Sequence, residues 1–574
     1  MNLKLVFAVT LLSAGNVCAG MSFASGVHAS TLRGRVVGVD GGAVALAMVT
    51  VRDERDGYAE SVFTDDHGEY KLVGGLSGQL NLRVRKPYYR DIVQGIVLVS
   101  GQETHSNLTL KRLESDQEIS DSLPALFHFD RISFQATGPF DRANFQRDCL
   151  TCHQLGNAHT RLTLPPEGWD AIVKQMHGWL GNFDSSLRQQ RAELLSMAFD
   201  GRPLSVRPVF PSDPSLSKVK IYEYRLDQAV VPHDADINPN DGHAYIVDEG
   251  ADQMIIVDLE KHTKKYVPEP SNGSPVGGKF GQPLLFNMAV RRGPHSLALG
   301  PDHRYYVTDA FAGGLSVFNP KNAAWEEAYD AGPNSRYSHT VRIAKNGDAW
   351  FTVAFSDQVG RFDSKTRRVE VIDLPKMKPV GIAAVTTPYG LDISPIDGTV
   401  WYARLYGDKI GRIDPKTKEV VEYDSPVKGP RRIRFDRNGE LWVAGFNNGE
   451  LARISTTPFH AKIYALPTYS PGAVPAPYAV AIDPDTQDVW ITEIMTDQLF
   501  RFVPSEERFY AYPLPLRGSY TRDLSFTRDG RVCTSNNPVP KAALEGGVLE
   551  LICIGIDKSG ASTSLRYQDK HDKS

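Results

Sequence analysis

Short apolar and aromatic runs, separated by turn residues, recur at a regular interval between residues 215 and 557. Each unit opens with a turn and a strand and continues, after a Gly-, Asp- or Asn-rich turn, into an aromatic strand such as Ala349-Trp350-Phe351-Thr352. Most units are roughly 40 to 50 residues long, which is typical of a four-stranded propeller blade. Seven such units predict a seven-bladed β-propeller, in which residues 218–224 join the last blade and close the ring.

The segment before the propeller divides into three regions. Residues 30–112 contain short β-rich runs between Gly-, Asp- and Ser-rich turns, which predict a small β-sandwich. Residues 113–140 mix acidic residues, Ser and Pro with phenylalanines, and we expect a linker that packs against another part of the chain. Residues 141–205 show helical periodicity, with one helix starting at Pro165-Pro166 and another over residues 185–199. The predicted fold class is mainly β: a sandwich, a small α-helical domain and a propeller.

The two ends of the chain differ from these regions. Residues 1–29 are predicted to be a cleaved export signal, because Lys4 precedes an apolar stretch that is too short to span a bilayer. A lipoprotein signal through Cys18 is an alternative, and no other run approaches the length of a membrane helix. We therefore expect a soluble, exported protein with no transmembrane segment and with a C-terminal tail at residues 558–574.

Composition and charge exclude some classes of protein. The chain is 41% hydrophobic and 23% charged, unlike a disordered chain. With 64 basic and 68 acidic residues and no basic block, it is not expected to bind nucleic acid. Five cysteines in 574 residues are too few for a disulfide scaffold, so their positions matter more than their number.

One motif carries strong chemistry. Cys149, Cys152 and His153 form Cys-x-x-Cys-His, the attachment signature of c-type haem, because two thiols one helical turn apart can each bond a haem vinyl group while the next imidazole binds the iron. The alternatives are a zinc knuckle, a thioredoxin-like pair or chance. No second Cys pair lies nearby to complete a zinc site, and a βαβ context is absent. We predict covalent haem c, and hence a periplasmic location.

The surroundings of the motif resemble the small cytochrome c modules that are fused to periplasmic redox enzymes. The resemblance is carried by Cys-x-x-Cys-His followed by Trp169-x-x-Ile172-Val173-x-x-Met176. It implies that Met176 is the sixth iron ligand, and a Met/His pair raises the reduction potential. An ordinary core methionine is the alternative, and the other candidate ligands are His159, His177 and Met197.

Two further resemblances concern the β regions. Thr64-Asp65-x-x-Gly68-x-Tyr70 resembles the carboxypeptidase regulatory-like domain, which implies a spacer or docking module. The repeats, such as Pro388-Tyr389-Gly390-Leu391, resemble the streptogramin (virginiamycin B) lyase family. That resemblance implies a base at His233 or His295, a Mg²⁺ ion held by acidic neighbours, and a counterpart of the family's glutamate at Glu249. However, Val231 and Gly293 stand where the family has glutamate before Pro-His.

The opening of each repeat places a residue at one mouth of the propeller channel. A second set follows from the end of each aromatic strand. Imidazoles with carboxylates could hold a divalent ion or act as acid and base, and two arginines favour an anionic substrate. The alternative is a wet, polar channel with no function. The candidate catalytic residues are His233, His295, His339, Tyr389, Arg431, Tyr478 and Arg522, and the candidate divalent-ion ligands are Asp248, Glu249, Asp309 and Glu493.

Cys533 and Cys553 fall on neighbouring predicted strands of the last blade, where they form either a disulfide or two buried thiols.

Three functions remain open. The first, which we favour, is a haem-linked oxidoreductase whose propeller binds or oxidises a small, anionic molecule and which passes electrons to a periplasmic partner. The second is a lyase on the propeller with an independent cytochrome, and the third is a scaffold presenting a cytochrome. A haem close to the channel mouth would favour the first.

Overall fold

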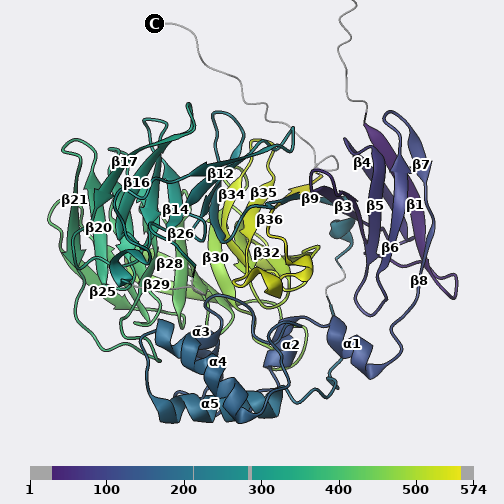
Figure 1. Cartoon of the computed structure of the whole chain (residues 1–574), viewed down its shortest axis with the longest axis horizontal. Coiled ribbons are helices and arrows are strands. Elements are labelled where there is room, and N and C mark those ends of the chain that lie inside the picture. Colours follow the sequence, from purple (N-terminus) through teal and green to yellow (C-terminus); the bar gives the residue numbers. More distant parts are fainter. Residues whose placement is uncertain (1–28, 211–212, 282–287, 558–574) are drawn as a thin grey trace, which may run out of the picture.

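The computed structural model describes residues 29–210, 213–281 and 288–557, and the predicted export signal and tail lie almost wholly outside these ranges. Seven antiparallel blades of four strands are arranged around a central channel (Figure 1), six as separate sheets and one as part of an eight-stranded sheet. The innermost strands of successive blades contact one another around the ring, and β10 also contacts β34. The predicted propeller is present. Its first three blades consist of β10 (Pro232–Ile237), β11 (Ala244–Asp248), β12 (Gln253–Val257) and β13 (Lys264–Pro268); β14 (Pro294–Leu299), β15 (Tyr305–Asp309), β16 (Gly314–Asn319) and β17 (Ala324–Asp330); and β18 (Ser338–Ile343), β19 (Ala349–Val353), β20 (Gln358–Asp363) and β21 (Arg368–Asp373).

The remaining blades repeat the same order of strands. The tryptophans of the aromatic strands are buried between blades: Trp350 packs with Leu391 of the next blade, and Trp401 packs with Ile433. The strands are β22 (Pro388–Ile393), β23 (Val400–Arg404), β24 (Lys409–Ile413) and β25 (Val420–Asp424); β26 (Pro430–Phe435), β27 (Leu441–Gly445), β28 (Glu450–Thr456) and β29 (Phe459–Ala465); β30 (Pro477–Ile482), β31 (Val489–Glu493), β32 (Gln498–Val503) and β33 (Arg508–Pro513); and β34 (Thr521–Phe526), β35 (Val532–Asn536) and β36 (Glu550–Ile556) with β9 (Val219–Arg225).

Every innermost strand carries a β-bulge directly after its opening residue. In the first blade the register shifts between Pro232 and Ala235, and the other six blades shift at the equivalent place. A bulge breaks the strict alternation of a strand and re-aims a side chain. This irregularity coincides with the positions that the sequence predicts to line the channel mouth.

The last blade closes the ring as predicted. β9 pairs with β36, so a strand from before the first repeat completes the blade. Cys533 of β35 lies directly opposite Cys553 of β36, and the two form a disulfide. The covalent link therefore lies within the blade that joins the two ends of the propeller.

The N-terminal sandwich is joined to the propeller through a shared sheet, which the sequence did not predict. β9 pairs with β36 on one side and with β3 on the other, so the last blade continues as β34-β35-β36-β9-β3-β2-β5-β6. This arrangement covers the outer edge of β9. The sandwich strands are β1 (Ser30–Gly38), β2 (Met48–Asp53), β3 (Tyr58–Phe63), β4 (Glu69–Gly74), β5 (Gly78–Arg85), β6 (Ile92–Leu98), β7 (Glu103–His105) and β8 (Leu108–Leu110).

The helices lie below the β domains in Figure 1, most of them under the propeller and the first nearer to the sandwich. The segment expected as a linker contains two of them, and the second is wholly buried, with Phe127 and Phe129 in a core shared with propeller residues such as Phe446 and Tyr478. The two helices expected after Pro165 and over 185–199 are present. The helices are α1 (Asp116–Ser122), α2 (Ala125–Phe129), α3 (Arg142–Cys149), α4 (Pro166–Trp179) and α5 (Ser185–Ala198), and short 3-10 turns lie at η1 (Pro214–Lys218), η2 (Gly278–Phe280), η3 (Lys541–Ala543) and η4 (Glu545–Gly547).

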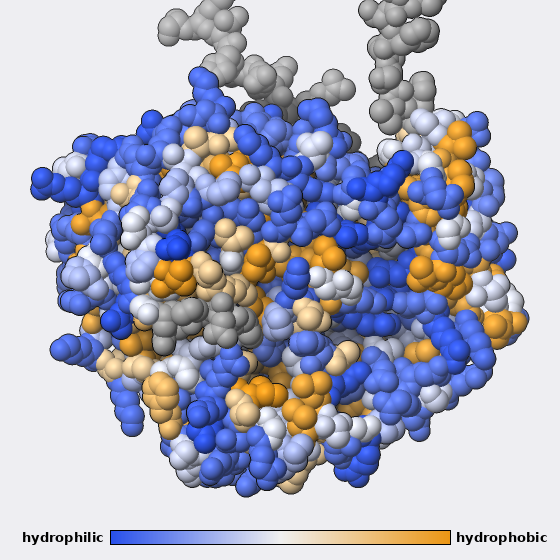
Figure 2. All heavy atoms as spheres, viewed as in Figure 1, coloured by the Kyte–Doolittle hydropathy of each residue, from blue (hydrophilic) through white to orange (hydrophobic). Residues whose placement is uncertain are grey.

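The visible surface is mainly hydrophilic, with apolar side chains on the sandwich at the right of Figure 2 and others at the centre and the lower part of the view. The exposed apolar residues of the sandwich include Val93 and Val97 of β6. None of the helices in the described residues is long and apolar enough to cross a membrane.

Candidate functional site

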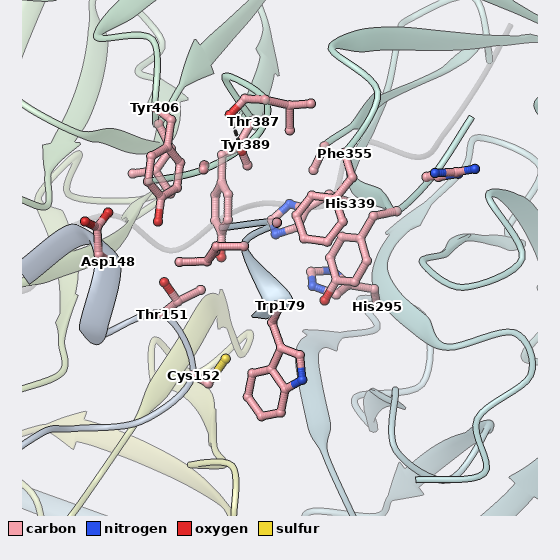
Figure 3. A pocket seen from close by; sticks show the side chains of 18 of the residues that line it. Asp148, Thr151, Cys152, Trp179, His295, His339, Phe355, Thr387, Tyr389 and Tyr406 are labelled. Carbon is pink, nitrogen blue, oxygen red and sulfur yellow. Dashed lines mark hydrogen bonds between the residues drawn. The ribbon is translucent and has the colours of Figure 1, made fainter. Parts of the chain in front are cut away.

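One cavity lies between the helical segment and the mouth of the propeller channel (Figure 3). Its volume is about 320 Å³, and small-molecule sites commonly measure about 300–1,000 Å³. Cys149, Cys152 and His153 line one part of it, and His295 and His339 line another. Two sets of residues that the sequence singled out separately therefore share one cavity.

The seven predicted mouth residues come together as a ring, and all are buried. Their placement by the seven bulges explains why side chains so far apart in sequence meet. The ring has two parts of different chemistry. We call the residues of blades one to three the histidine side, and those of blades four to seven the tyrosine–arginine side: His233, His295 and His339, and Tyr389, Arg431, Tyr478 and Arg522.

The histidine side is a group of closely packed, mutually tilted imidazoles. The ring centroids of His233 and His295 are 3.6 Å apart, and those of His295 and His339 are 4.2 Å apart. Burial lowers the pKa of His233 to about 3, with a contribution from the Arg522 charge, and burial also holds the pKa values of His295 and His339 well below the usual range. Imidazoles held neutral in this way keep a lone pair that can coordinate a metal.

The tyrosine–arginine side is an internally bonded network. The hydroxyls of Tyr389 and Tyr478 are 2.7 Å apart, and Arg522 Nη1 donates to Tyr478 Oη at 2.9 Å. Arg431 Nη2 donates to Tyr389 Oη at 3.0 Å, and its guanidinium lies 3.9 Å from the Tyr478 ring centroid. The arginine charges thus meet aromatic faces and phenol oxygens.

This side also holds the Cys-x-x-Cys-His loop. Arg431 Nη2 donates to the carbonyl of Thr151, between the two cysteines, at 3.4 Å. The Tyr520 hydroxyl lies 2.7 Å from the carbonyls of both Leu150 and Thr151, and the Val539 N–H donates to the Cys152 carbonyl at 3.2 Å. The position of the loop is therefore fixed by propeller residues.

The residues of the loop fit a covalent haem. Cys149 and Cys152 are free thiols, and burial raises their pKa values to about 12 and about 11, unlike the lowered values of redox dithiols. His153 Nδ1 donates to the Gln154 carbonyl at 2.7 Å, which leaves Nε2 with a lone pair for iron. Within the described ranges, the two thiols and His153 do not converge as a metal site, which disfavours the zinc knuckle.

The candidates for the sixth iron ligand now differ in position. Met176 of α4 lines the cavity with Cys149, Cys152 and His153. His177 of α4 is buried, with its Nε2 3.3 Å from Arg191 Nη1, and does not line the cavity. His159 is exposed, Met197 is 62% exposed, and neither lines the cavity. The geometry keeps Met176 and disfavours the three alternatives.

Of the four predicted carboxylate ligands, only Glu249 lies at the mouth. Burial raises its pKa to about 7, and one of its oxygens accepts a 2.8 Å hydrogen bond from Tyr337. Ligand atoms of Glu249, His233 and His295 lie within 4.8 Å of one another.

The prediction that Asp248, Asp309 and Glu493 are ligands is not supported, because each is bonded to the segment that leads into its own blade. Asp248 accepts hydrogen bonds from the Val230 and Val231 N–H groups, and Glu493 accepts one from Ala476. Asp309 pairs with Arg292. In these three blades the carboxylate therefore fastens the blade rather than facing the channel.

The channel beyond the mouth is filled by ion pairs between blades that are not neighbours. Arg432 of blade five binds Asp234 of blade one through two hydrogen bonds of 2.8 and 2.9 Å. Asp523 of blade seven pairs with Arg342 of blade three and with Arg432, each at 3.0 Å. A small molecule at the mouth is therefore confined to the side that faces the helices.

The sequence analysis did not identify Tyr337, which bonds Glu249, or Tyr520, which bonds the Cys-x-x-Cys-His loop (residues 149–153, the haem-motif loop). Both stand immediately before the opening residue of their blade, the repeat position where Val231 and Thr387 also line the cavity. A comparison of the seven repeats at this one position would have revealed them.

The fold and site define a seven-bladed propeller whose mouth is capped by a helical, Cys-x-x-Cys-His segment. Residues 286–532 match the virginiamycin B lyase family model, and residues 31–111 match the carboxypeptidase regulatory-like domain. A streptogramin B lyase structure is 19% identical and covers 59% of this chain and 98% of its own, with a TM-score of 0.47. The virginiamycin B lyase of Staphylococcus aureus is 17% identical and covers 59% of this chain and 100% of its own, with a TM-score of 0.47. Kuenenia stuttgartiensis hydrazine synthase is 15% identical and covers 57% of this chain and 97% of its own, with a TM-score of 0.43. No curated protein matches the chain.

Proposed function

We propose that this chain is an exported haem c protein that binds and oxidises a small anionic molecule at the propeller mouth and passes the electrons to a periplasmic partner. The observation that carries the proposal is the shared cavity, which Cys152 and His153 line together with His233, His295 and His339. Because the proposed haem site and the proposed substrate site share this cavity, electrons can pass directly from the substrate to the haem. The shared cavity therefore favours a coupled redox site over two independent modules.

The chain's own residues have separate tasks in this proposal. Cys149 and Cys152 would attach the haem, and His153 and Met176 would hold its iron; the bound group would supply one-electron transfer. Tyr520 and Arg431 hold the loop against the propeller, and the neutral imidazoles of the histidine side line the space in which the substrate would bind.

The charge of the site favours an anion. Arg522 and Arg336 are the arginines that line the cavity. Arg522 is buried and, among the described residues, bonds Asn537 and Tyr478 but forms no ion pair, while Arg336 is exposed. A buried cation without a carboxylate partner is costly unless an anion joins it. A small carboxylate or oxyanion would supply that partner beside the imidazoles.

The test uses the full chain, produced in cells that attach haem c. We expect one covalent haem per chain by mass measurement of the denatured protein, and we expect Cys152→Ser to lose the second thioether bond. His159→Ala, an exposed histidine close to the motif, is the matched control and should keep haem content and spectrum. Oxidisable small anions are then screened for reduction of the haem absorbance.

Two results would count against this function. A chain without covalent haem removes its basis. If the chain carries haem but no compound that binds the channel reduces it, the haem and the propeller act independently. That result favours the function of a scaffold that presents a cytochrome.

A lyase function is the second candidate, since residues 286–532 match the virginiamycin B lyase family and His233, His295 and Glu249 adjoin one another at the mouth. Its substrate would be a cyclic ester, opened by elimination with no net electron transfer. We expect turnover to require a divalent ion, to survive Cys152→Ser and to be abolished by His233→Ala. The absence of glutamate before Pro232 and Pro294 weighs against it.

A further inference from the structure

We propose that His233, Glu249 and His295 bind one divalent transition-metal ion of the Zn²⁺ type at the propeller mouth, with an open coordination position facing the haem-motif loop. All three side chains are buried, and their ligand atoms lie within 4.8 Å of one another. They come from the first two blades, at the end of β11 and the starts of β10 and β14. The site does not depend on the proposed haem chemistry.

The hydrogen bonds around these residues support the assignment. His233 Nδ1 lies 3.0 Å from Asp234 Oδ1, and because a carboxylate only accepts, Nδ1 carries the proton and Nε2 keeps its lone pair. Asp234 is itself fixed by two bonds from Arg432. A carboxylate behind a histidine is the usual second layer of a metal site, since it fixes the ring and raises its basicity.

The other two ligands carry independent signals. His295 Nδ1 is buried and has no hydrogen-bond partner among the described residues. A buried polar atom without a partner is costly, and a bound ion would remove that cost. The Tyr337 hydroxyl donates to one oxygen of Glu249 at 2.8 Å, which orients the carboxylate. His233 and Glu249 are therefore each oriented by a hydrogen bond with a neighbouring residue, and His295 has a buried nitrogen without a partner among the described residues.

The three ligands indicate which metal would bind and whether the site would be catalytic or structural. Two imidazoles and one carboxylate suit Zn²⁺ and its first-row neighbours, whereas Mg²⁺ prefers oxygen ligands and retains several waters. Bonds of about 2.0–2.2 Å would draw the three atoms together by side-chain rotation. Three protein ligands beside a cavity leave a position for water or for the anionic group of a substrate, as in catalytic rather than structural zinc sites.

The experiment measures metal binding by the full chain with its haem. The protein is treated with chelator, and Zn²⁺ and Mg²⁺ are titrated separately by calorimetry, with zinc content counted by elemental analysis. We expect one Zn²⁺ per chain and much weaker binding of Mg²⁺. His295→Ala and Glu249→Gln should each lower the Zn²⁺ affinity at least 100-fold, and Tyr337→Phe about 10-fold.

The controls separate this site from surface binding and from the haem. His243→Ala, which removes a half-buried histidine close to Asp241 and Asp258, should bind Zn²⁺ as the wild type does. Haem absorbance, measured in each variant, reports the proposed function independently. If Glu249→Gln fails to fold, Tyr337→Phe still decides, because it removes only one hydroxyl. Equal affinities for Zn²⁺ and Mg²⁺, or unchanged Zn²⁺ affinity in every ligand variant, would overturn the proposal.

Discussion

The two sides of the propeller mouth occupy equivalent places in the repeat and yet serve different purposes. On the tyrosine–arginine side, the polar groups bond one another and the backbone of residues 150–151. On the histidine side, His295 Nδ1 has no partner among the described residues, and the three tilted rings pack together beside the cavity. One side is thus a platform for the haem-motif loop, and the other offers atoms to a ligand. Position in a repeat predicts placement, whereas the partners decide the role.

The largest expected effect concerns the blade that carries Arg522. The Cys533–Cys553 disulfide closes a loop of 20 residues within it, and removing such a link costs about 3 kcal/mol. We expect the double variant Cys533→Ala/Cys553→Ala to lower the free energy of unfolding by about that amount, measured by denaturant titration. Haem content and Zn²⁺ affinity should stay unchanged, since neither thiol lines the cavity. Unchanged stability would show that the disulfide does not hold this blade.

The next effect tests the platform directly. Tyr520→Phe removes a buried hydroxyl bonded to two carbonyls of the loop, and unsatisfied buried groups cost about 1–3 kcal/mol. We expect about 2 kcal/mol of lost stability and a shifted haem reduction potential. Tyr337→Phe is the matched control from the histidine side, and it should leave the potential close to that of the wild type. Equal shifts in both variants would contradict the division of the mouth.

A smaller effect concerns anion binding. Arg522→Gln removes a buried charge from the cavity, and we expect about a tenfold weaker affinity for formate as a probe anion, about 1.4 kcal/mol, followed by haem absorbance. Arg336→Gln removes an exposed charge at the same cavity, where water screens it, so its effect should be smaller. The reverse order would place the anion at the outer rim.

Much of the fold could be predicted because the same sequence pattern occurs in each of the seven repeats. Seven openings and the aromatic strands fixed the propeller, and the position of residues 218–224 before the first unit fixed its closure. The pairing of β3 with β9 could not be predicted, because two strand edges carry no sequence signal for each other.

The site was predicted unevenly for a related reason. The seven mouth residues share one repeat position and meet as expected, and Glu249 adjoins two of them. Asp248, Asp309 and Glu493 also share a position, but their partners are nearby backbone N–H groups and Arg292. Residue type alone does not distinguish a carboxylate that fastens a turn from one that faces a channel. The proximity of the haem motif to the mouth depends on tertiary contacts, which no local pattern encodes.

The smallest expected effect is a difference in response to alkaline pH. Burial acts to raise the pKa of Tyr478, but the charges of Arg522, Arg431 and Arg432 outweigh it and hold that pKa below its usual value of 10.0. The unfolded chain therefore keeps this proton to higher pH than the folded chain does, so the contribution of Tyr478 to stability rises as the pH increases toward 10. We expect a phenolate absorbance change below pH 10 that disappears in Tyr478→Phe. Replacing His339 by Gln on the histidine side should leave the change in place, because the three guanidiniums that lower the pKa of Tyr478 lie on blades five and seven. A change that persists in Tyr478→Phe would assign the phenolate to another tyrosine and remove the electrostatic contrast between the two sides.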